Sequence, residues 1–372
     1  MRVLHIITGN DNGGGANHVL NLCHYSKKYF KSIIGCIGEG PLYINAKKLN
    51  INTELFNSKD ILNKSIEKYV IKNKIDIVNF HGAKAFLLHK FLKRKLTVPT
   101  VATIHSDYRR DFLNNKVKYY LFTPLSVSGV KSFNNYICVS NYIKDLLIKD
   151  RFSGNKFVVN NGIDINKNNE ISRKRIDDLK DELKIKSNDF VYIMIARMHP
   201  IKNHKLLIKA FNNLAKEYDN IKLLLLGDGE EKENIENQVK TLGIDKKVIF
   251  AGFKTNILDY LSFSNVSILT SFSEGGSPPL VILESALKKI PVIASKVGDI
   301  EEIVNGENGF LIDPKSCEDI YNKMKKCYLT KKKLDVLGNK LYYDVCNKYS
   351  IDKFCKAYYH CYNSIVNFGG TK

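Results

Sequence analysis

Short runs of β-branched and aliphatic residues alternate along this chain with segments whose apolar residues recur every three or four positions. Such alternation is typical of parallel sheets covered by helices. A polar, asparagine-rich segment at 160–175 interrupts the pattern, which then starts again. We predict strands at 3–7, 32–37, 51–56, 76–80, 99–104, 136–140 and 156–160, and again at 190–196, 221–227, 247–252, 266–270 and 291–295. The pattern therefore predicts an α/β protein with two doubly wound sheets.

The length of 372 residues suits two domains of ordinary size. We place the first at residues 1–165 and the second at 166–348. After Asp313 the pattern is helical without a further strand. We expect a C-terminal helix at about 349–366 to pack back on the first domain.

The chain carries 58 lysines and arginines against 38 acids, a formal charge of +20, which attracts phosphates, nucleic acid or acidic lipid headgroups. A general abundance of lysine along the chain, unrelated to any partner, is the alternative explanation of this charge. The eight cysteines form no CxxC pair and no zinc-ligand spacing. No apolar stretch reaches the roughly 20 residues that span a bilayer, and the N-terminal run is too short for a signal peptide. We expect a cytoplasmic protein with reduced thiols.

Ligands of open α/β sheets bind beyond the carboxyl ends of the strands, so loops that follow strands are candidate sites. Gly13, Gly14 and Gly15 follow the first strand and precede a helix, where backbone N–H groups can approach an anion. Their spacing is not GxGxxG, and a purely structural glycine loop is the alternative. Arg197 and Lys202 follow the strand at 190–196. A guanidinium fork and a mobile ammonium together suit a diphosphate.

The stretch SEGGSPPLVILES at 273–285 contains two acids around a glycine–proline loop. We predict that Ser277 caps a helix whose first turn contains the two following prolines. Its positive end would hold a phosphate, helped by the N–H groups of Gly275 and Gly276. Glu274 and Glu284 would repel that phosphate, so we expect them to accept hydrogen bonds from hydroxyl groups of a sugar and a ribose.

Seven motifs together resemble glycosyltransferase family 4, whose members have the two-domain GT-B fold. They occur in the family's order over nearly the full chain: GGGANHV, HSD (105–107), NNGID (160–164), ARMHPIK (196–202), LLGDGEE (225–231), SEGG…LES and GDIEEIV…GFLIDP (298–314). The resemblance implies a retaining transferase that moves a hexosyl-type sugar from a nucleotide-diphosphate donor.

The resemblance also implies roles for individual residues. Arg197 and Lys202 match the family's diphosphate-binding pair, Glu274 the acid on the sugar hydroxyls, and His105 a histidine near the sugar. These four are our candidate catalytic residues. The candidate donor-binding residues are Gly14, Gly15, Gly275, Gly276, Ser277, Glu284 (for the ribose), Asn161 and Gly227.

Two departures from the family pattern stand out. Two more residues separate Glu274 from Glu284 than is usual, and Lys289 stands where the family commonly has glycine. The latter costs modest strain if that residue has a positive φ.

In the implied mechanism, the cations stabilise the departing nucleoside diphosphate, and we expect no metal ion. We expect a UDP-sugar rather than a GDP-sugar as donor. The acceptor would be a saccharide or a lipid-linked saccharide in bacterial surface polysaccharide synthesis. The mixed basic and apolar segment 83–96 predicts binding to the anionic inner face of the plasma membrane, although an ordinary solvated helix explains it equally.

Two other functions stay open at this point. A nucleotide-sugar 2-epimerase would have the same fold and donor but no acceptor. A basic nucleic-acid-binding protein would use the positive charge, but the sequence lacks the aromatic pattern of RNA-binding sheets, and we expect no nucleic-acid partner.

Overall fold

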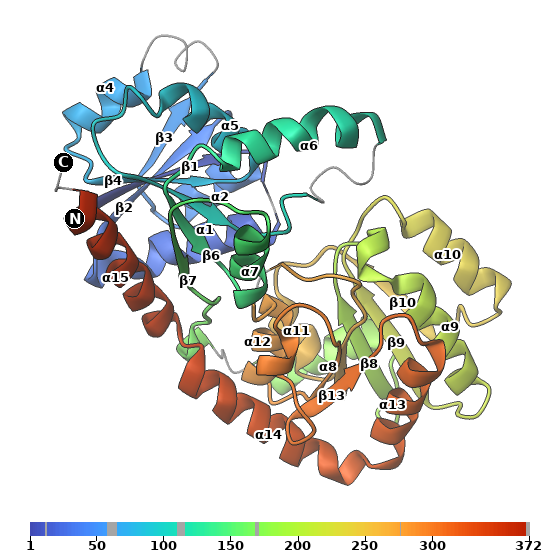
Figure 1. Cartoon of the computed structure of the whole chain (residues 1–372). Coiled ribbons are helices and arrows are strands. Elements are labelled where there is room, and N and C mark those ends of the chain that lie inside the picture. The colour runs from blue at the N-terminus through green and yellow to red at the C-terminus, as the bar shows by residue number, and fades with distance from the viewer. Residues whose placement is uncertain (12, 58–64, 110–115, 168–170, 276, 370–372) are drawn as a thin grey trace. The chain divides into compact units, whose positions relative to one another are not determined.

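The computed structural model of the chain describes residues 1–11, 13–57, 65–109, 116–167, 171–275 and 277–369 (Figure 1). They form two compact units. The first unit comprises residues 1–162, 275–277 and 351–372, and the second comprises 163–274 and 278–350. The chain leaves the first unit after Gly162, three residues before the boundary placed by the sequence. Each unit is described below by itself.

The first unit contains a seven-stranded parallel sheet in the order β3-β2-β1-β4-β5-β6-β7. Its strands are β1 (Arg2–Thr8), β2 (Lys31–Ile37), β3 (Thr53–Phe56), β4 (Ile77–His81), β5 (Thr100–Ile104), β6 (Asn135–Cys138) and β7 (Asn155–Val158). Its helices are α1 (Gly14–Tyr25), η1 (Ser26–Lys28), α2 (Pro41–Lys48), α4 (Ser65–Lys72), α5 (Ala83–Leu92), α6 (Lys116–Val130), α7 (Asn141–Lys149) and α15 (Ile351–Gly369).

Alternate residues of each strand supply two cores in this unit, because successive side chains point to opposite faces of a sheet. Leu4 and Ile6 of β1 pack with α4, α5 and α7 on one face. Val3 packs on the other face with α15, the red helix of Figure 1, which also contacts α1. The aromatic side chains of Tyr358 and Tyr362 are fully buried there.

The second unit contains a six-stranded parallel sheet in the order β10-β9-β8-β11-β12-β13. Its strands are β8 (Phe190–Ile195), β9 (Ile221–Leu226), β10 (Val248–Gly252), β11 (Val266–Leu269), β12 (Val292–Ser295) and β13 (Gly309–Ile312). Its helices are η2 (Ile165–Lys167), α8 (Arg173–Glu182), η3 (Pro200–Lys202), α9 (His204–Ala215), α10 (Lys232–Thr241), α11 (Ile257–Leu261), α12 (Leu280–Leu287), η4 (Ile300–Glu302), α13 (Cys317–Leu329) and α14 (Lys331–Lys348).

The two doubly wound parallel sheets confirm the predicted fold class. β13, a four-residue edge strand that pairs with β12, was not predicted from the sequence. It begins with Gly309 and directly follows an asparagine- and glycine-containing turn, and these residue types are depleted in strands. In the second unit, Tyr192 and Met194 of β8 pack with α9, α10 and α13, while Val191 and Ile193 pack with α8 and α11.

Lys289, which follows α12, has a φ of 55°. A side chain in this left-handed region costs roughly 1 kcal/mol, a cost that glycine avoids. The departure seen in the sequence therefore does fall on a strained position. Its carbonyl oxygen also lies only 1.8 Å from where a Cβ on Gly338 would be, so α14 can approach this turn only with a glycine there.

No helix within the described residues is long and apolar enough to cross a membrane.

Candidate active site

The strand order of the second unit places a topological switch point at the carboxyl ends of β8 and β11. The chain runs from β8 outward through β9 and β10, then returns to β11 on the other side of β8. Loops that leave two such neighbouring strands in opposite directions open a crevice, where ligands of these folds bind. Arg197 and Lys202 follow β8, and Glu274 follows β11. All three candidates therefore lie at the switch point of one sheet.

Arg197 lies at the exposed edge of this cluster, with 68% of its side chain accessible. Its Nη2 donates to Oε2 of Glu230 at 2.9 Å. His199 Nε2 lies 3.5 Å from the other oxygen of the same carboxylate. Burial raises the pKa of Glu230, but a hydrogen bond from its own backbone N–H and the charge of Arg197 lower it by more. The pKa of Glu230 therefore lies below its ordinary value. An ionised Glu230 therefore holds the guanidinium in place.

Lys202 is the last residue of η3, and its Nζ donates to Oε1 of Glu274 in a close ion pair. Only 23% of the lysine side chain and 12% of the glutamate side chain are accessible. Backbone contacts fix the two loops: Thr270 donates to the carbonyl of Lys202 at 3.0 Å, and Phe272 N–H donates to that of Ile201 at 2.8 Å. The structure thus brings together two predicted residues that are 72 positions apart.

Gly227 follows β9 and lies beside the exit of β8. Its φ is 133°, and a Cβ there would lie 2.1 Å from the carbonyl oxygen of Ala196. The N–H of Met198 donates to the carbonyl of Asp228 at 2.9 Å, which continues the pairing past the ends of both strands. Only glycine permits this close approach. Gly227 therefore shapes the loop that carries Arg197.

The predicted helix start at Ser277 is wrong. α12 begins at Leu280, with Pro279 as its N-cap and no side-chain cap, and Ser277 lies three residues earlier. The reason is that a residue before proline is driven out of the helical region. Both Ser277 and Pro278 precede a proline, so neither joins the helix. Gly276 lies outside the described residues.

Gly275, Ser277 and Asn161 belong to the first unit, whereas Glu274 belongs to the second. Ser140 Oγ donates to the carbonyl of Gly275 at 2.9 Å. Ser277 is buried, its N–H donates to Val139 O at 3.2 Å, and its carbonyl accepts from the Asn161 N–H at 2.9 Å. Their backbone groups are thus engaged within the first unit.

Glu284 lies in the second turn of α12 and is half-buried. It therefore belongs to the element that follows β11, the same strand that precedes Glu274. The neighbouring Ile282, Leu283 and Ser285 are buried, so packing holds the helix backbone that carries Glu284 in place.

His105, Gly14 and Gly15 lie together in the first unit. α1 begins at Gly14, and its N-cap Gly13 provides no side-chain hydrogen bond. A Cβ on Gly15 would lie 3.5 Å from the ring of His105, so the helix start faces this imidazole closely. His105 directly follows β5, and burial followed by the charge of His18 holds its pKa well below the ordinary value.

Two family models match successive parts of the chain: "Glycosyltransferase Family 4" matches residues 12–167, and "Glycosyl transferases group 1" matches residues 175–342. The chain belongs to glycosyltransferase family 4. It is therefore a glycosyltransferase, which favours a transfer reaction over the epimerase and nucleic-acid-binding alternatives.

Named relatives agree with this assignment. The chain is 28% identical over 300 residues to UDP-Gal:alpha-D-GlcNAc-diphosphoundecaprenol alpha-1,3-galactosyltransferase of Escherichia coli, covering 78% of this chain and 75% of the relative. It is 29% identical over 215 residues to alpha-monoglucosyldiacylglycerol synthase of Streptococcus pneumoniae, covering 56% of this chain and 48% of the relative.

The crystal structure of Anabaena HepE in complex with UDP and glucose superposes on this glycosyltransferase with a TM-score of 0.84. The two are 21% identical, and the match covers 98% of this chain and 100% of the other. The likeness supports the GT-B fold, which was predicted from the sequence.

Three side chains of this glycosyltransferase that the sequence analysis missed lie against the candidates. Glu230 pairs with Arg197, and His18 and His81 contact His105. Each lies in a segment with a recognisable signal: Glu230 in LLGDGEE, His18 one turn into the helix after the glycines, and His81 at the last position of a strand.

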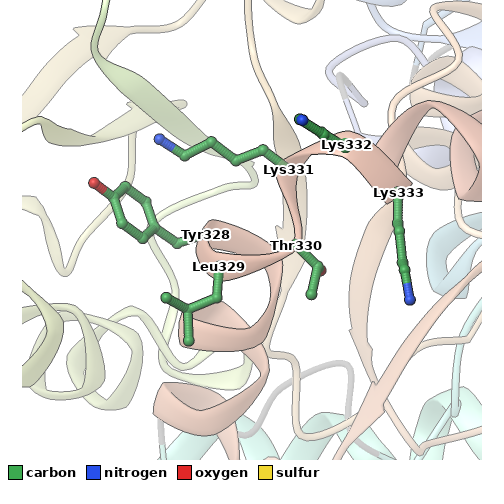
Figure 2. A pocket seen from close by; sticks show the side chains of 6 residues that line it. All are labelled: Tyr328, Leu329, Thr330, Lys331, Lys332 and Lys333. Carbon is green, nitrogen blue, oxygen red and sulfur yellow. The ribbon is translucent and has the colours of Figure 1, made fainter.

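A shallow hollow of about 380 Å³ lies at the junction of α13 and α14 (Figure 2). Lys331 Nζ lies 4.0 Å from the centre of the Tyr328 ring, whereas Lys333 points away from that ring. None of the residues assigned to the donor lines this hollow. Among the described residues, no group of three or more His, Cys, Asp or Glu side chains could hold a metal ion.

Proposed function

We propose that this glycosyltransferase takes a UDP-sugar as donor and transfers its hexosyl group, with retention of configuration, to a saccharide or lipid-linked acceptor of a bacterial surface polysaccharide. The observation that carries the proposal is the cluster of Arg197, Lys202 and Glu274 at the switch point of the second sheet. Two similar proteins support it: HepE has been crystallised with UDP and glucose, and the Escherichia coli relative is named as a UDP-galactose-dependent transferase.

Lys202 and Glu274 would exchange partners when a donor binds. The ammonium carries three donor hydrogens, so it can turn toward a diphosphate oxygen while retaining or loosening its bond to the carboxylate. Glu274 then has acceptor capacity for sugar hydroxyls. The protein would thus present a cation to the diphosphate and a carboxylate to the adjacent sugar of the same ligand.

The reaction breaks the bond between the anomeric carbon and the diphosphate oxygen, and the bonding electrons leave with that oxygen. Arg197 and Lys202 stabilise the negative charge that develops on the leaving group. The acceptor hydroxyl attacks from the face that the diphosphate vacates, and its proton passes to the departing phosphate oxygen. The side chains thus supply the positive charge that this mechanism needs, and we propose that no metal ion takes part.

UDP should raise the melting temperature of the protein, because a ligand that binds only the native state stabilises it. At 100 times its Kd the gain is about 2.7 kcal/mol, or roughly 5 °C for a unit of this size. Uridine, which lacks phosphates, serves as the control and should shift the temperature by less than about 1 °C. A shift with GDP and none with UDP would contradict the proposed donor.

We further propose that α5 and the residues after it bind an anionic membrane surface, which would bring the enzyme to a lipid-linked acceptor. The apolar residues Phe86, Leu88 and Leu92 face the core, whereas Phe91 is 68% exposed. The exposed positive charges around it are those of Lys84, Lys90, Lys93, Arg94 and Lys95. The Streptococcus pneumoniae relative is named as a synthase of a glycolipid, which supports a lipid surface.

Replacing Lys84, Lys93 and Arg94 by glutamine should weaken binding to vesicles with anionic lipid about 100-fold, since each cation near such a surface contributes roughly 1 kcal/mol. Co-sedimentation with vesicles measures the binding. Lys331, Lys332 and Lys333, all exposed in the second unit, provide a triple glutamine control with the same change of charge. Equal loss in both triple variants would argue for unspecific attraction by net charge.

A further inference from the structure

Three histidines of the first unit lie on one face of its sheet, on three neighbouring strands. His5 lies within β1, His81 ends β4, and His105 follows β5. The register pairs His5 with Asn79 and His81 with Thr103. Because side chains two positions apart share a face, all three imidazoles point to the side that α1 and α15 cover.

The three rings form a continuous hydrogen-bonded chain. His5 Nδ1 lies 3.1 Å from His81 Nε2, and His81 Nδ1 lies 2.9 Å from His105 Nε2. Both pairs of rings are stacked, with interplanar angles of 30° and 24°. The chain ends at His105, the histidine assigned to the sugar.

Burial keeps these imidazoles neutral at pH 7. His5 and His81 are 0% and 1% exposed. Burial, and then the charge of His18, lowers the pKa of His5 to about 3, and burial also holds the pKa of His81 well below its ordinary value. A neutral imidazole carries a hydrogen on only one of its two nitrogens, so each ring has one donor and one acceptor nitrogen.

Only two arrangements of the hydrogens satisfy both bonds. Either His5 donates to His81 and His81 donates to His105, or both bonds run in the opposite direction. Nε2 of His5 is buried and has no hydrogen-bond partner among the described residues. The second arrangement would leave an N–H group orphaned there, and buried orphaned N–H groups are rare. In the first arrangement Nε2 of His5 carries no hydrogen, so no buried N–H group is left without an acceptor.

We propose that His5 and His81 act as positioning residues that fix the tautomer of His105, so that its Nε2 accepts from His81 and its Nδ1 carries the hydrogen. The hydrogen bond made by one ring nitrogen decides which nitrogen is protonated. His105 is thereby a hydrogen-bond donor before any substrate arrives.

A second buried hydrogen-bond network links the strands that carry these histidines to α15. Thr103 Oγ1 donates to Asn79 Oδ1 at 2.9 Å, and Asn79 Nδ2 donates to the hydroxyl of Tyr362 at 2.7 Å. His18 packs edge-on against His105 at 4.7 Å between ring centres, and its own nitrogens bond to Asn161 and Tyr358. The imidazole of His105 therefore has little freedom to rotate.

The consequence for catalysis rests on the proposed function. If a nucleotide-sugar binds near His105, the Nδ1–H group can donate to a sugar hydroxyl or to a phosphate oxygen, whereas the opposite tautomer would present a lone pair and repel a phosphate. Preorganised donors of this kind stabilise charge in the transition state without rearrangement.

Long-range ¹H–¹⁵N correlation spectra of histidine-labelled protein test the tautomer without substrate. We expect His105 with Nδ1 protonated and Nε2 bare in the wild type, and a mixture of tautomers in His81→Leu and His5→Phe. A His105 protonated at Nε2 in the wild type would overturn the proposal. The spectrum decides this even if no transfer activity is found, so failure of the proposed function is a separate outcome.

The kinetic test uses two amides at position 81. The asparagine amide reaches about where Nδ1 of histidine lies and can still donate to His105, whereas the glutamine amide reaches about where Nε2 lies. We expect kcat to fall about 10- to 100-fold in His81→Leu and His81→Gln, and to recover to within about 3-fold in His81→Asn. A merely structural role predicts no advantage of asparagine over glutamine, and equal activity of these two variants would refute the positioning role.

Discussion

Replacing Arg197 and Lys202 together by glutamine should lower kcat/KM for the donor by about 1,000-fold or more. Loss of one preorganised donor at a developing negative charge commonly costs 100- to 1,000-fold. Here two cations are lost, and each leaves a carboxylate, Glu230 or Glu274, without its charged partner. Those carboxylates would then repel the diphosphate. Initial rates over a range of donor concentrations measure the effect.

The two single variants should lower kcat/KM to different extents. Arg197 is 68% accessible, whereas Lys202 and Glu274 are only 23% and 12% accessible, so the unpaired charge left by Lys202→Gln is screened less. We therefore expect the larger single effect at Lys202. In Lys202→Gln/Glu274→Gln the stranded charge is gone, and donor binding should recover in part relative to Lys202→Gln.

Lys205→Gln is the matched control. Lys205 lies in the first turn of α9, is exposed and pairs with Glu231, so the substitution removes the same charge close by. Its kcat/KM should stay within about 3-fold of the wild type. If Arg197 and Lys202 can be neutralised with no more effect than Lys205, the assignment of the cation cluster to the diphosphate is wrong.

Acidification from pH 7 to pH 5 should destabilise the first unit by roughly 6 kcal/mol. Burial lowers the pKa of His5 and His89 to about 3 and that of His18 to about 4, against about 6.5 in an unfolded chain. Because the folded pKa values are lowered, the unfolded chain binds more protons as the pH falls below 6.5. Stability is fully present above 6.5 and is lost progressively toward pH 3 to 4.

At pH 5 each such histidine costs about 2 kcal/mol, which is 1.5 pH units at 1.36 kcal/mol each. Three of them remove a large part of an ordinary free energy of unfolding. Urea unfolding followed by circular dichroism at several pH values gives the slope of the unfolding free energy against pH, which is about 1.36 kcal/mol for each additional proton that the unfolded state binds. An unfolding free energy that is the same at pH 7 and pH 5 would contradict burial of neutral histidines.

Variants separate this effect from general acid sensitivity. His89 is buried, and its two nitrogens lie within hydrogen-bonding distance of Ser132 and Thr100, so His89→Gln should remove about 2 kcal/mol of the pH dependence. His360 is exposed on α15. His360→Gln changes the same residue type without burial, and the pH dependence should stay as in the wild type.

Local sequence patterns predicted most of the fold because they depend on near neighbours. Each of the twelve predicted strands overlaps a strand of the structure, since apolar β-branched runs bounded by turns are read over a few residues. The errors also have local causes. β13 begins with a glycine after an asparagine- and glycine-containing turn, so it does not stand out as a strand, and the first turn predicted for α12 ignored the effect of Pro279 on Pro278.

The candidate residues were found by their position after strands, together with the resemblance to the family. That reasoning identified Lys202 and Glu274 individually, but not that they pair with each other. It identified His105 but overlooked His81, although that residue stands at the end of a strand. It also overlooked His5, because a histidine within an apolar strand has no local pattern that distinguishes it from the rest of the core.

The sequence by itself thus determined which residues stand at the ends of strands, and it determined the fold class, because both follow from patterns over short distances. Only the tertiary structure decided which of these residues meet. The pairing of Lys202 with Glu274, and the chain from His5 through His81 to His105, depend on which strands lie side by side. Strand order arises from packing across the whole sheet, and no local run of residues encodes it.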